Sequence, residues 1–337
     1  MAINEHTRNI VVIGASAGGV EALQCLFRSL PPELPAVFLV VLHIPPYTPS
    51  ALSSVLSRVT SMPVLSVIED QALKAGRVYV ASADHHLVVV DGGLRVTRGP
   101  KECRSRPAID VLFRSASVIH EERVIGVVLS GALDDGTAGL WAIKDRNGLA
   151  MVQDPGEAGH SSMPKSAIQH VAVDFIGTVK ELASEIAKQV HTQIAPKNAH
   201  PANERHLIES GISINGNGLG TGVMGLGNIS NYTCPDCHGV LVQIKEGSIL
   251  RFRCHTGHAF SVKALIADVN EAIDKGLWDT LRAVEERIML LRQMADLAED
   301  DGNADDAERY RTQASRAEER LIPLRELVLD PEFFRLE

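Results

Sequence analysis

The sequence predicts a doubly wound α/β fold with a mainly parallel sheet and helices on both faces, followed by a small zinc-ribbon-like module and a helical hairpin. From residue 9 to residue 190, short β-branched runs alternate with amphipathic stretches, which is the pattern of βαβ units. Cysteines then crowd between residues 234 and 254. Beyond residue 261, apolar side chains recur at three- and four-residue spacing, as they do on one face of a helix.

The bulk composition is that of an ordinary globular protein. The chain has 337 residues, of which 45% are hydrophobic and 22% charged, which allows one large core and a smaller module. Its N-terminus lacks the basic and apolar regions of a signal peptide, and no apolar run reaches the roughly 18 residues of a membrane span. The net charge of −9 argues against a nucleic-acid partner. We therefore expect a cytoplasmic protein with reduced thiols and no membrane insertion.

The elements of the α/β domain can be assigned in order. A strand at 9–14 precedes a helix at 20–30, and the run 36–43 (AVFLVVLH) is apolar enough to be a parallel strand buried on both faces. Residues 63–97 contain shorter strand-like runs with a hairpin signal at Asp91-Gly92-Gly93, and we expect a β-rich excursion at the sheet edge. The parallel pattern returns in a strand at 123–130, a helix at 137–146 and a strand at 149–153.

Composition divides the chain into four parts. Residues 1–190 form the α/β domain, which is the candidate catalytic domain, and the Asn-, Gly- and Pro-rich residues 191–230 are expected to be a flexible linker. Residues 231–260 carry the clustered cysteines. Residues 261–337 predict two antiparallel helices separated by the acidic stretch DLAEDDGNADDAE. This hairpin is expected either to pack on its own metal module or to serve as a docking or dimerisation surface.

A glycine-rich turn around Ser16 is the first candidate catalytic feature. The segment Gly14-Ala-Ser-Ala-Gly-Gly19 lies between a buried strand and a helix and has the G-x-S-x-G spacing of a nucleophile elbow. Glycines permit the tight turn and leave room for a substrate carbonyl beside the hydroxyl. The helix that follows offers backbone N–H groups and a positive dipole end. The same pattern also suits a phosphate-binding loop or a structural turn.

Two further residues lie where apolar strands end. His43 closes the run 36–43, and Asp135 follows the strand at 123–130 after a short loop. Either could have an ordinary role, His43 as a surface residue and Asp135, or its neighbour Asp134, as a helix cap. Because the carboxyl ends of parallel strands share one edge of a sheet, we expect Ser16, His43 and Asp135 to meet there as nucleophile, base and orienting carboxylate.

The cysteine-rich segment has the spacing of a structural zinc site. It contains Cys234-Pro-Asp-Cys237 and Cys254-His-Thr-Gly-His258, which is C-x2-C followed by C-x3-H. Four such ligands close a tetrahedral site and would stabilise a module too small for a core of its own. We favour Cys234, Cys237, Cys254 and His258 as ligands of a structural Zn²⁺, with His255 and His238 as alternatives for the fourth place. No cofactor is expected for catalysis.

These residues resemble the catalytic domain of the CheB-type protein-glutamate methylesterases over about residues 9–190. The likeness extends through five blocks in order: IGASAGGVEAL, LHIPP, RSRPAIDVLFRSA, VLSGALDDGTAGL and SSMPKSAI. The resemblance implies that Ser16, His43 and Asp135 form the triad, and it favours Asp135 over Asp134. It also implies hydrolysis of glutamate γ-methyl esters on chemoreceptors, often with deamidation of receptor glutamines. The backbone of Ala132 matches a position that lines the family's oxyanion site.

Some features depart from the family's pattern. The family's receiver domain usually precedes the catalytic domain, whereas only eight residues precede the first strand, so we expect no phosphorylation control in cis. The block that commonly reads threonine-glycine-methionine-glycine is Ser130-Gly-Ala-Leu133, and Ala17 stands where threonine is common. Arg104, Arg106 and Pro107 are expected either to shape the substrate surface or to form a solvated basic face.

Three functions from different classes follow. The leading hypothesis is a methylesterase acting on a chemoreceptor, with the tail binding a methyltransferase or another partner in a signalling array. The second is a catalytically idle adaptor that binds a receptor and recruits a partner through its tail. The third is a nucleotide-binding domain that uses the loop 14–19, although the second strand ends in His43 where a ribose-binding acid is expected.

Overall fold

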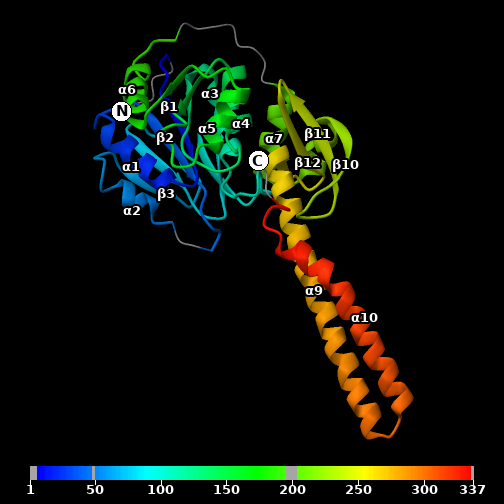
Figure 1. Cartoon of the computed structure of the whole chain (residues 1–337). Coiled ribbons are helices and arrows are strands. Elements are labelled where there is room, and N and C mark those ends of the chain that lie inside the picture. The colour runs from blue at the N-terminus through cyan, green and yellow to red at the C-terminus, as the bar shows by residue number, and fades with distance from the viewer. Residues whose placement is uncertain (1–5, 48–49, 195–202, 335–337) are drawn as a thin grey trace. The chain divides into compact units, whose positions relative to one another are not determined.

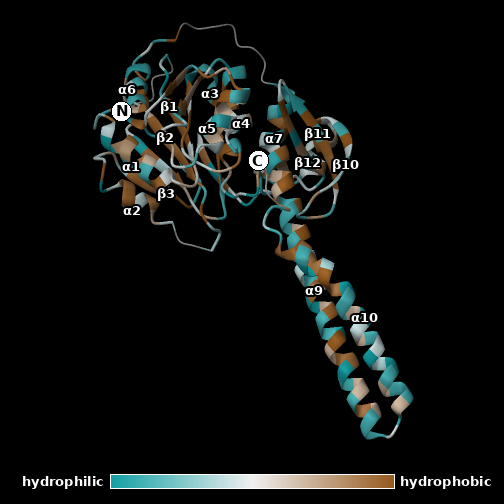
Figure 2. Ribbon diagram, viewed as in Figure 1, coloured by the Kyte–Doolittle hydropathy of each residue, from teal (hydrophilic) through white to brown (hydrophobic). Residues whose placement is uncertain are grey.

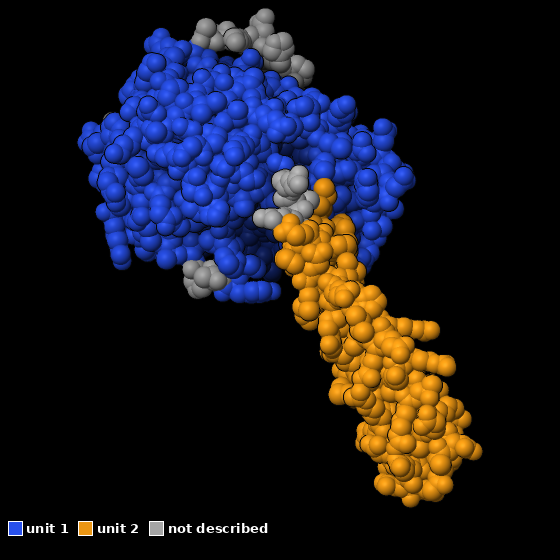
Figure 3. All heavy atoms as spheres, viewed as in Figure 1, with its two compact units in different colours: residues 1–265 blue, residues 266–337 orange. Residues whose placement is uncertain are grey.

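The computed structural model describes residues 6–47, 50–194 and 203–334 and divides the chain into two compact units, residues 1–265 and 266–337 (Figure 3). The first unit contains both the α/β domain and the cysteine-rich module. Among the described residues, no helix combines the length and the apolar character needed to cross a bilayer.

A seven-stranded sheet with strand order β3-β4-β2-β1-β7-β8-β9 forms the centre of the first unit (Figure 1). Every neighbouring pair of these strands is parallel, which confirms the predicted doubly wound fold. The chain leaves β1 in one direction for β2 and later returns to its other side as β7. The strands are β1 (Ile10–Ala15), β2 (Val37–Leu42), β3 (Val64–Val67), β4 (Arg77–Ala81), β7 (Val124–Val128), β8 (Leu149–Gln153) and β9 (Phe175–Gly177).

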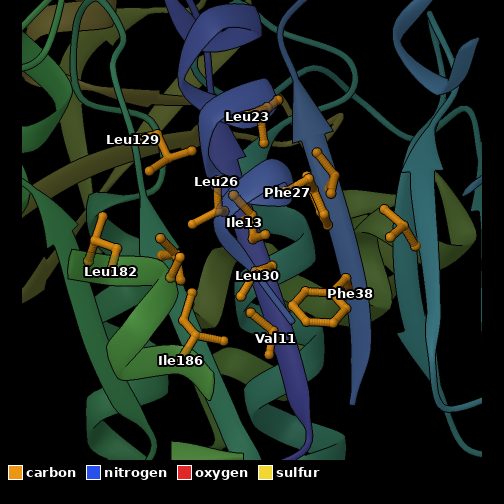
Figure 4. Close-up of a cluster of buried hydrophobic side chains, with 14 of the residues drawn as sticks. Val11, Ile13, Leu23, Leu26, Phe27, Leu30, Phe38, Leu129, Leu182 and Ile186 are labelled. Carbon is orange, nitrogen blue, oxygen red and sulfur yellow. The ribbon is translucent and has the colours of Figure 1, made fainter. Parts of the chain in front are cut away.

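Helices cover both faces of this sheet. One face carries α1 (Gly19–Ser29), α2 (Leu52–Leu56) and α6 (Val179–Gln189), and the other carries α3 (Ile109–His120), α4 (Thr137–Asp145) and α5 (Ser162–His170); the short 3-10 helix η1 (Glu121–Arg123) follows α3. β1 is buried along its whole length because its alternate side chains face different helical layers. Ile10 and Val12 belong to the core under α3, whereas Val11 and Ile13 belong to the core under α1 and α6 (Figure 4). Figure 2 shows the resulting concentration of hydrophobic residues in the strands.

The segment 63–97 differs from the predicted excursion at the sheet edge. β3 and β4 are integral strands of the main sheet, where β4 pairs in parallel with β2 and β3 with β4. These strands do lie at the sheet edge, as expected, but they continue the main sheet instead of leaving it; the runs are short, and β3 is only partly buried, as an outermost strand is. The separate hairpin is confined to β5 (His86–Val90) and β6 (Gly93–Thr97). Its predicted turn is confirmed, with Gly92 at a φ of 83°.

The predicted flexible linker at 191–230 is wrong for much of its length. Residues 195–202 lie outside the described part of the chain, but α7 (Glu204–Asn215), α8 (Gly218–Thr221) and the 3-10 helix η2 (Val223–Gly225) follow them. The Asn203 side chain caps α7 by accepting a hydrogen bond from Arg205 N, and α7 ends at Gly216 with a φ of 65°. The Asn- and Gly-rich composition therefore marks the helix ends, while buried residues such as Ile212 fix the helix in place.

The cysteine-rich module is a four-stranded antiparallel sheet, which we call the ribbon. It consists of β10 (Asn228–Thr233), β11 (Val240–Glu246), β12 (Ile249–Cys254) and β13 (Ala259–Ser261), so it begins three residues earlier than predicted. Its apolar side includes Leu241, Phe252 and Phe260, which pack with the thiols of Cys234 and Cys254 and with Cys103 of the α/β domain.

The C-terminal helices form the predicted hairpin. They are α9 (Val262–Asp300) and α10 (Ala304–Leu329), and the side chain of Asn303 caps α10 by accepting a hydrogen bond from Asp306 N. The predicted stripe of α9 provides the seam, in which Leu281, Ile288 and Leu291 pack against Ala314 and Leu321 of α10. The acidic stretch DLAEDDGNADDAE contains the turn between α9 and α10, and most of its carboxylates are exposed to solvent there.

Candidate active site

Ser16 lies directly after β1, at the carboxyl edge of the sheet. The backbone N–H of Ser16 donates to Ser130 O at 2.9 Å, which ties the loop to the residue two positions after β7. The loop then turns through Gly18, with a φ of 71°, into α1. A Cβ at Gly18 would lie 2.7 Å from Ser130 Oγ, so both the backbone angle and the space require glycine. Ser16 itself is partly exposed, as a nucleophile must be.

His43 lies beside Ser16 on the neighbouring strand end. Ala15 and Leu42 are paired in the parallel register, and His43 N donates to Ala15 O at 3.1 Å. Adjacent strands are about 4.8 Å apart, so the side chains of Ser16 and His43 begin from neighbouring points on the carboxyl edge of the sheet, which we call the rim. The described hydrogen bonds include one between His43 Nε2 and Asp135 Oδ2, at 2.7 Å, but none between the Ser16 hydroxyl and the ring. The ring nitrogen that remains for Ser16 is Nδ1.

Asp135 is held rigidly behind His43. The carboxylate is 2% exposed, and its Oδ2 accepts a hydrogen bond from Ile109 N at 2.7 Å. Its Oδ1 accepts from Asp110 N at 3.0 Å and from Gly136 N at 2.9 Å. Asp135 therefore caps the N-terminus of α3, rather than only the helix that begins beside it in sequence. Such a set of donors stabilises the ionised carboxylate that can orient an imidazole.

Asp110 caps the N-terminus of α4 in the same way. Its Oδ1 accepts hydrogen bonds from Gly136 N at 2.9 Å and from Gly139 N at 2.6 Å, at the start of α4. The two helices thus exchange caps, each receiving a carboxylate from the other's N-terminal region. Burial, followed by the nearby charge of Asp135, raises the pKa of Asp110 well above its ordinary value. The direction of this shift reflects the cost of burying a second carboxylate charge beside Asp135.

Asp134 makes different contacts from its neighbour. Its Oδ1 accepts a hydrogen bond from Ser261 Oγ of the ribbon at 2.6 Å, and its backbone oxygen accepts from Thr137 N at 3.1 Å. Burial raises the pKa of Asp134. Of the two carboxylates left open by the spacing, Asp135 is the one in contact with His43.

Ser130 joins the loops around the site, and its part could not be read from the sequence motif. Its buried hydroxyl donates to Ala17 O at 2.7 Å and accepts from His160 N at 2.9 Å. The next residue, Gly131, donates its N–H to His160 O at 2.9 Å. A hydroxyl is thus the feature that this position needs, because it both donates and accepts a hydrogen bond between the two loops.

The arginine segment is structured rather than a solvated basic face. Arg106 Nη2 donates to Asp84 Oδ1 at 2.6 Å, and its Nη1 donates to Gly99 O at 2.8 Å. The Arg106 side chain is 16% exposed. The Arg106 guanidinium is thus already used to hold the 98–107 segment and is not part of a solvated face, whereas a role of this segment in shaping the substrate surface stays a prediction.

The four predicted metal ligands converge in the ribbon. One ligand atom each from Cys234, Cys237, Cys254 and His258 lies within 4.8 Å of the others. His258 Nδ1 is 3.7 Å from Cys234 Sγ and 3.6 Å from Cys254 Sγ, and the Sγ atoms of Cys237 and Cys254 are 3.6 Å apart.

Those spacings fit a tetrahedral zinc ion. Zn–S bonds of about 2.3 Å place two thiolate sulfurs about 3.8 Å apart, close to the values found here. Hydrogen bonds from Cys234 and then from His258 lower the pKa of Cys254 to about 2, which favours the thiolate that binds metal. The alternatives His238 and His255 do not belong to this group of described residues.

A comparison with protein families matches residues 11–186 to the CheB methylesterase family model. A protein of Leptospira interrogans is 37% identical over 174 residues, which cover 51% of this chain and 90% of that protein. The protein-glutamate methylesterase/protein-glutamine glutaminase 2 of Methanosarcina mazei is 35% identical over 191 residues, 54% of this chain and 52% of the relative. The chain therefore spans only about half the length of that second relative.

A solved structure has the same fold. The CheB methylesterase catalytic domain of Thermotoga maritima superposes with a TM-score of 0.51 and 29% sequence identity. The match covers 53% of this chain and 97% of the Thermotoga domain. It follows that the likeness concerns the α/β domain.

Proposed function

The chain belongs to the CheB methylesterase family, and we propose that it is a protein-glutamate methylesterase that hydrolyses glutamate γ-methyl esters and releases methanol. The observation that carries the proposal is the contact between His43 Nε2 and buried Asp135, on the rim where Ser16 begins from the adjacent strand. The rim is the point where strand order reverses on either side of β1, which is where open α/β sheets bind ligands.

The chemistry proceeds through an acyl-enzyme. Ser16 Oγ attacks the ester carbonyl while His43 Nδ1 takes its proton, and Asp135 stabilises the resulting imidazolium. Backbone N–H groups at Ala132 and at the start of α1 stabilise the oxyanion. His43 then returns the proton to the departing methoxide, so that methanol leaves. Water attacks the acyl-enzyme by the same proton transfers and restores the glutamate and the Ser16 hydroxyl.

The substrate we propose is a methylated chemoreceptor. Relatives are named both as glutamate methylesterases and as glutamine glutaminases, and one acyl-enzyme route serves both reactions, since ammonia replaces methanol as the leaving group. The proposed substrate segment is a helical receptor signalling domain, and we propose that the enzyme acts in the cytoplasm. The ribbon's four ligands would hold Zn²⁺, which supplies structural stabilisation there and takes no part in the hydrolysis.

The test is methanol release from a receptor whose glutamates carry labelled methyl groups. We expect Ser16→Ala to lower the rate by about 10³-fold or more, since removing the nucleophile leaves only oxyanion and binding effects. The control is Ser184→Ala, which removes an exposed hydroxyl of α6 and should leave the rate unchanged. Release that persists undiminished in Ser16→Ala contradicts the mechanism. A wild-type protein that binds the receptor without releasing methanol is instead the adaptor.

A further inference from the structure

We infer that Ser261 is a positioning residue for the triad, and that the ribbon is thereby a working part of the catalytic unit. The inference rests on the proposed function and extends it to a residue that lies 127 positions from Asp134 in the chain. Ser261 ends the short strand β13, which directly follows the metal ligand His258.

The strand β13 is hydrogen-bonded to the α/β domain as well as to the ribbon. Ala259 N donates to Lys101 O at 3.1 Å, and Cys103 N donates to Ala259 O at 2.8 Å. On its other side, β13 pairs with β12, where Phe260 lies opposite Phe252. A metal held by His258 would thus fix a strand that is bonded both to β12 of the ribbon and to residues 101–103 of the α/β domain.

Ser261 connects that strand to the catalytic loop. Its hydroxyl donates to Asp134 Oδ1 at 2.6 Å and accepts from Ala264 N at 3.0 Å, so its orientation is fixed from both sides. Asp134 is the residue before Asp135, and the preceding Leu133 has a φ of 60°, which a leucine rarely adopts. An anchor on Asp134 holds this turn, and with it the backbone from which the Asp135 side chain projects.

A buried ion network forms the second connection. Arg253 of β12 is fully buried and donates to Glu102 Oε1 at 2.8 Å and to Glu209 Oε1 at 2.7 Å. Glu102 in turn accepts from Arg114 Nη2 of α3 at 2.7 Å. Because the first N–H groups of α3 hold Asp135, the ribbon, α3 and the catalytic carboxylate are connected by successive hydrogen bonds.

Several of the ribbon's hydrogen bonds lie near the catalytic carboxylate. They reach residues 101–103 and Asp134 directly and Arg114 through Glu102, while a further bond joins Ser248 to His170 of α5. One of these, Cys103, has its Sγ within 4.8 Å of a carboxylate oxygen of Asp135. Catalysis is sensitive to such support, because a misplacement of about 1 Å can cost about 100-fold in rate.

The experiment compares Ser261→Ala with Ser261→Thr in the methanol-release assay. We expect Ser261→Ala to lower kcat about tenfold with KM changed less than twofold, because the hydroxyl orients the triad and does not touch substrate. Threonine keeps the hydroxyl and should restore most of kcat. The acid limb of the pH–rate profile should move to lower pH in Ser261→Ala, since a less well placed Asp135 stabilises the imidazolium less.

Two measurements separate positioning from loss of structure. Ser230→Ala is the matched control, because Ser230 Oγ donates to Leu241 O within the ribbon at 2.7 Å, and it should leave kcat and the acid limb unchanged. Backbone hydrogen exchange at residues 131–136 should become faster both in Ser261→Ala and in the zinc-stripped protein, a result that does not depend on activity.

The inference is overturned if Ser261→Ala keeps the wild-type kcat, acid limb and exchange rates while Ser16→Ala is inactive in the same assay. It is equally overturned if Ser261→Ala and Ser230→Ala lose kcat to the same extent. If Ser16→Ala retains full activity, the proposed function fails instead, so the two failures are distinguishable.

Discussion

Asp135 shows how one side chain can satisfy two sequence-based interpretations at once. The spacing allowed either a helix cap or a triad carboxylate, and the structure has the carboxylate capping α3 while contacting His43. The helix it caps begins 26 residues earlier in the chain, and only the fold brings the two together. Capping fixes the carboxylate in position without an additional charged partner, which suits a group that must stay ionised.

A substitution at Gly14 tests whether the hydrogen bond from Ile109 N to Asp135 matters for the site. A Cβ at Gly14 would lie 2.3 Å from Ile109 Cγ2, so Gly14→Ala must displace the residue whose N–H holds Asp135. We expect the free energy of unfolding to fall by about 1–3 kcal/mol and kcat to fall with it, measured by urea unfolding and by methanol release.

The control for that substitution is Gly276→Ala in α9. Nothing lies within 4 Å of a Cβ at Gly276, and alanine in a helix should stabilise it by about 1 kcal/mol without changing kcat. Equal effects of the two substitutions on kcat would show that the Ile109 contact has no bearing on the site.

At the scale of elements, the strands that carry the site were the most predictable part of the chain. β1, β2 and β7 are continuous apolar runs, and Ser16, His43 and Asp135 follow their carboxyl ends, although the choice of Asp135 over Asp134 came from the family resemblance. The prediction failed for β3 and β4, which are short runs of which β3 is only partly buried, and for α7, whose helical ends are rich in Asn and Gly.

The connection between ribbon and α/β domain was not predictable from local pattern. Arg253 and Glu102 are 151 residues apart, and charged residues are ordinarily assigned to the surface. Ser261 similarly follows a metal motif without any signal of its own. Such long-range polar pairs depend on the assembled fold, whereas the C-x2-C and C-x3-H spacing pointed to the four residues that converge in the ribbon, with His255 and His238 left as alternatives for the fourth.

The metal site gives a prediction that belongs to the ribbon as an element. Cys234→Ser should abolish stoichiometric zinc binding and make residues 228–261 sensitive to protease, because a small module loses the stabilisation that four metal bonds provide. Elemental analysis and limited proteolysis measure the two effects. Cys25→Ser is the matched control, since Cys25 packs against the core under α1 and lies outside the ligand group. A folded Cys234→Ser ribbon without metal contradicts the assignment.

At the scale of the whole molecule, the buried ion network predicts a response to acid. Burial alone would raise the pKa of Glu102, but the charges of Arg114 and then Arg253 outweigh burial and lower it to about 2. Glu246 is likewise lowered to about 2, chiefly by Arg251 against burial. Because these values lie below the ordinary 4.5, the stabilisation is present above pH 4.5 and is lost as the pH falls towards 2.

Trp141 can report this transition, because its ring contacts His206 of α7 at 5.8 Å between centroids. The chain has two tryptophans, so Trp278→Phe isolates the signal of Trp141, and Trp141→Phe isolates that of the hairpin. We expect the Trp141 fluorescence to change between pH 4.5 and pH 2. A Trp141 signal that stays constant to pH 2 would show that the ion network does not control the contact between Trp141 of α4 and His206 of α7.

The order of the active-site residues along the chain has a consequence for synthesis of the protein. Ser16 and His43 leave the ribosome early, Asp135 follows 92 residues after His43, and Ser261 emerges 127 residues after Asp134. At translation rates of about 5–20 residues per second, the last interval alone occupies roughly 6–25 s. A nascent chain thus carries its nucleophile long before the residue that we infer supports its catalytic carboxylate, so the complete set of contacts around Asp134 and Asp135 can form only late in synthesis.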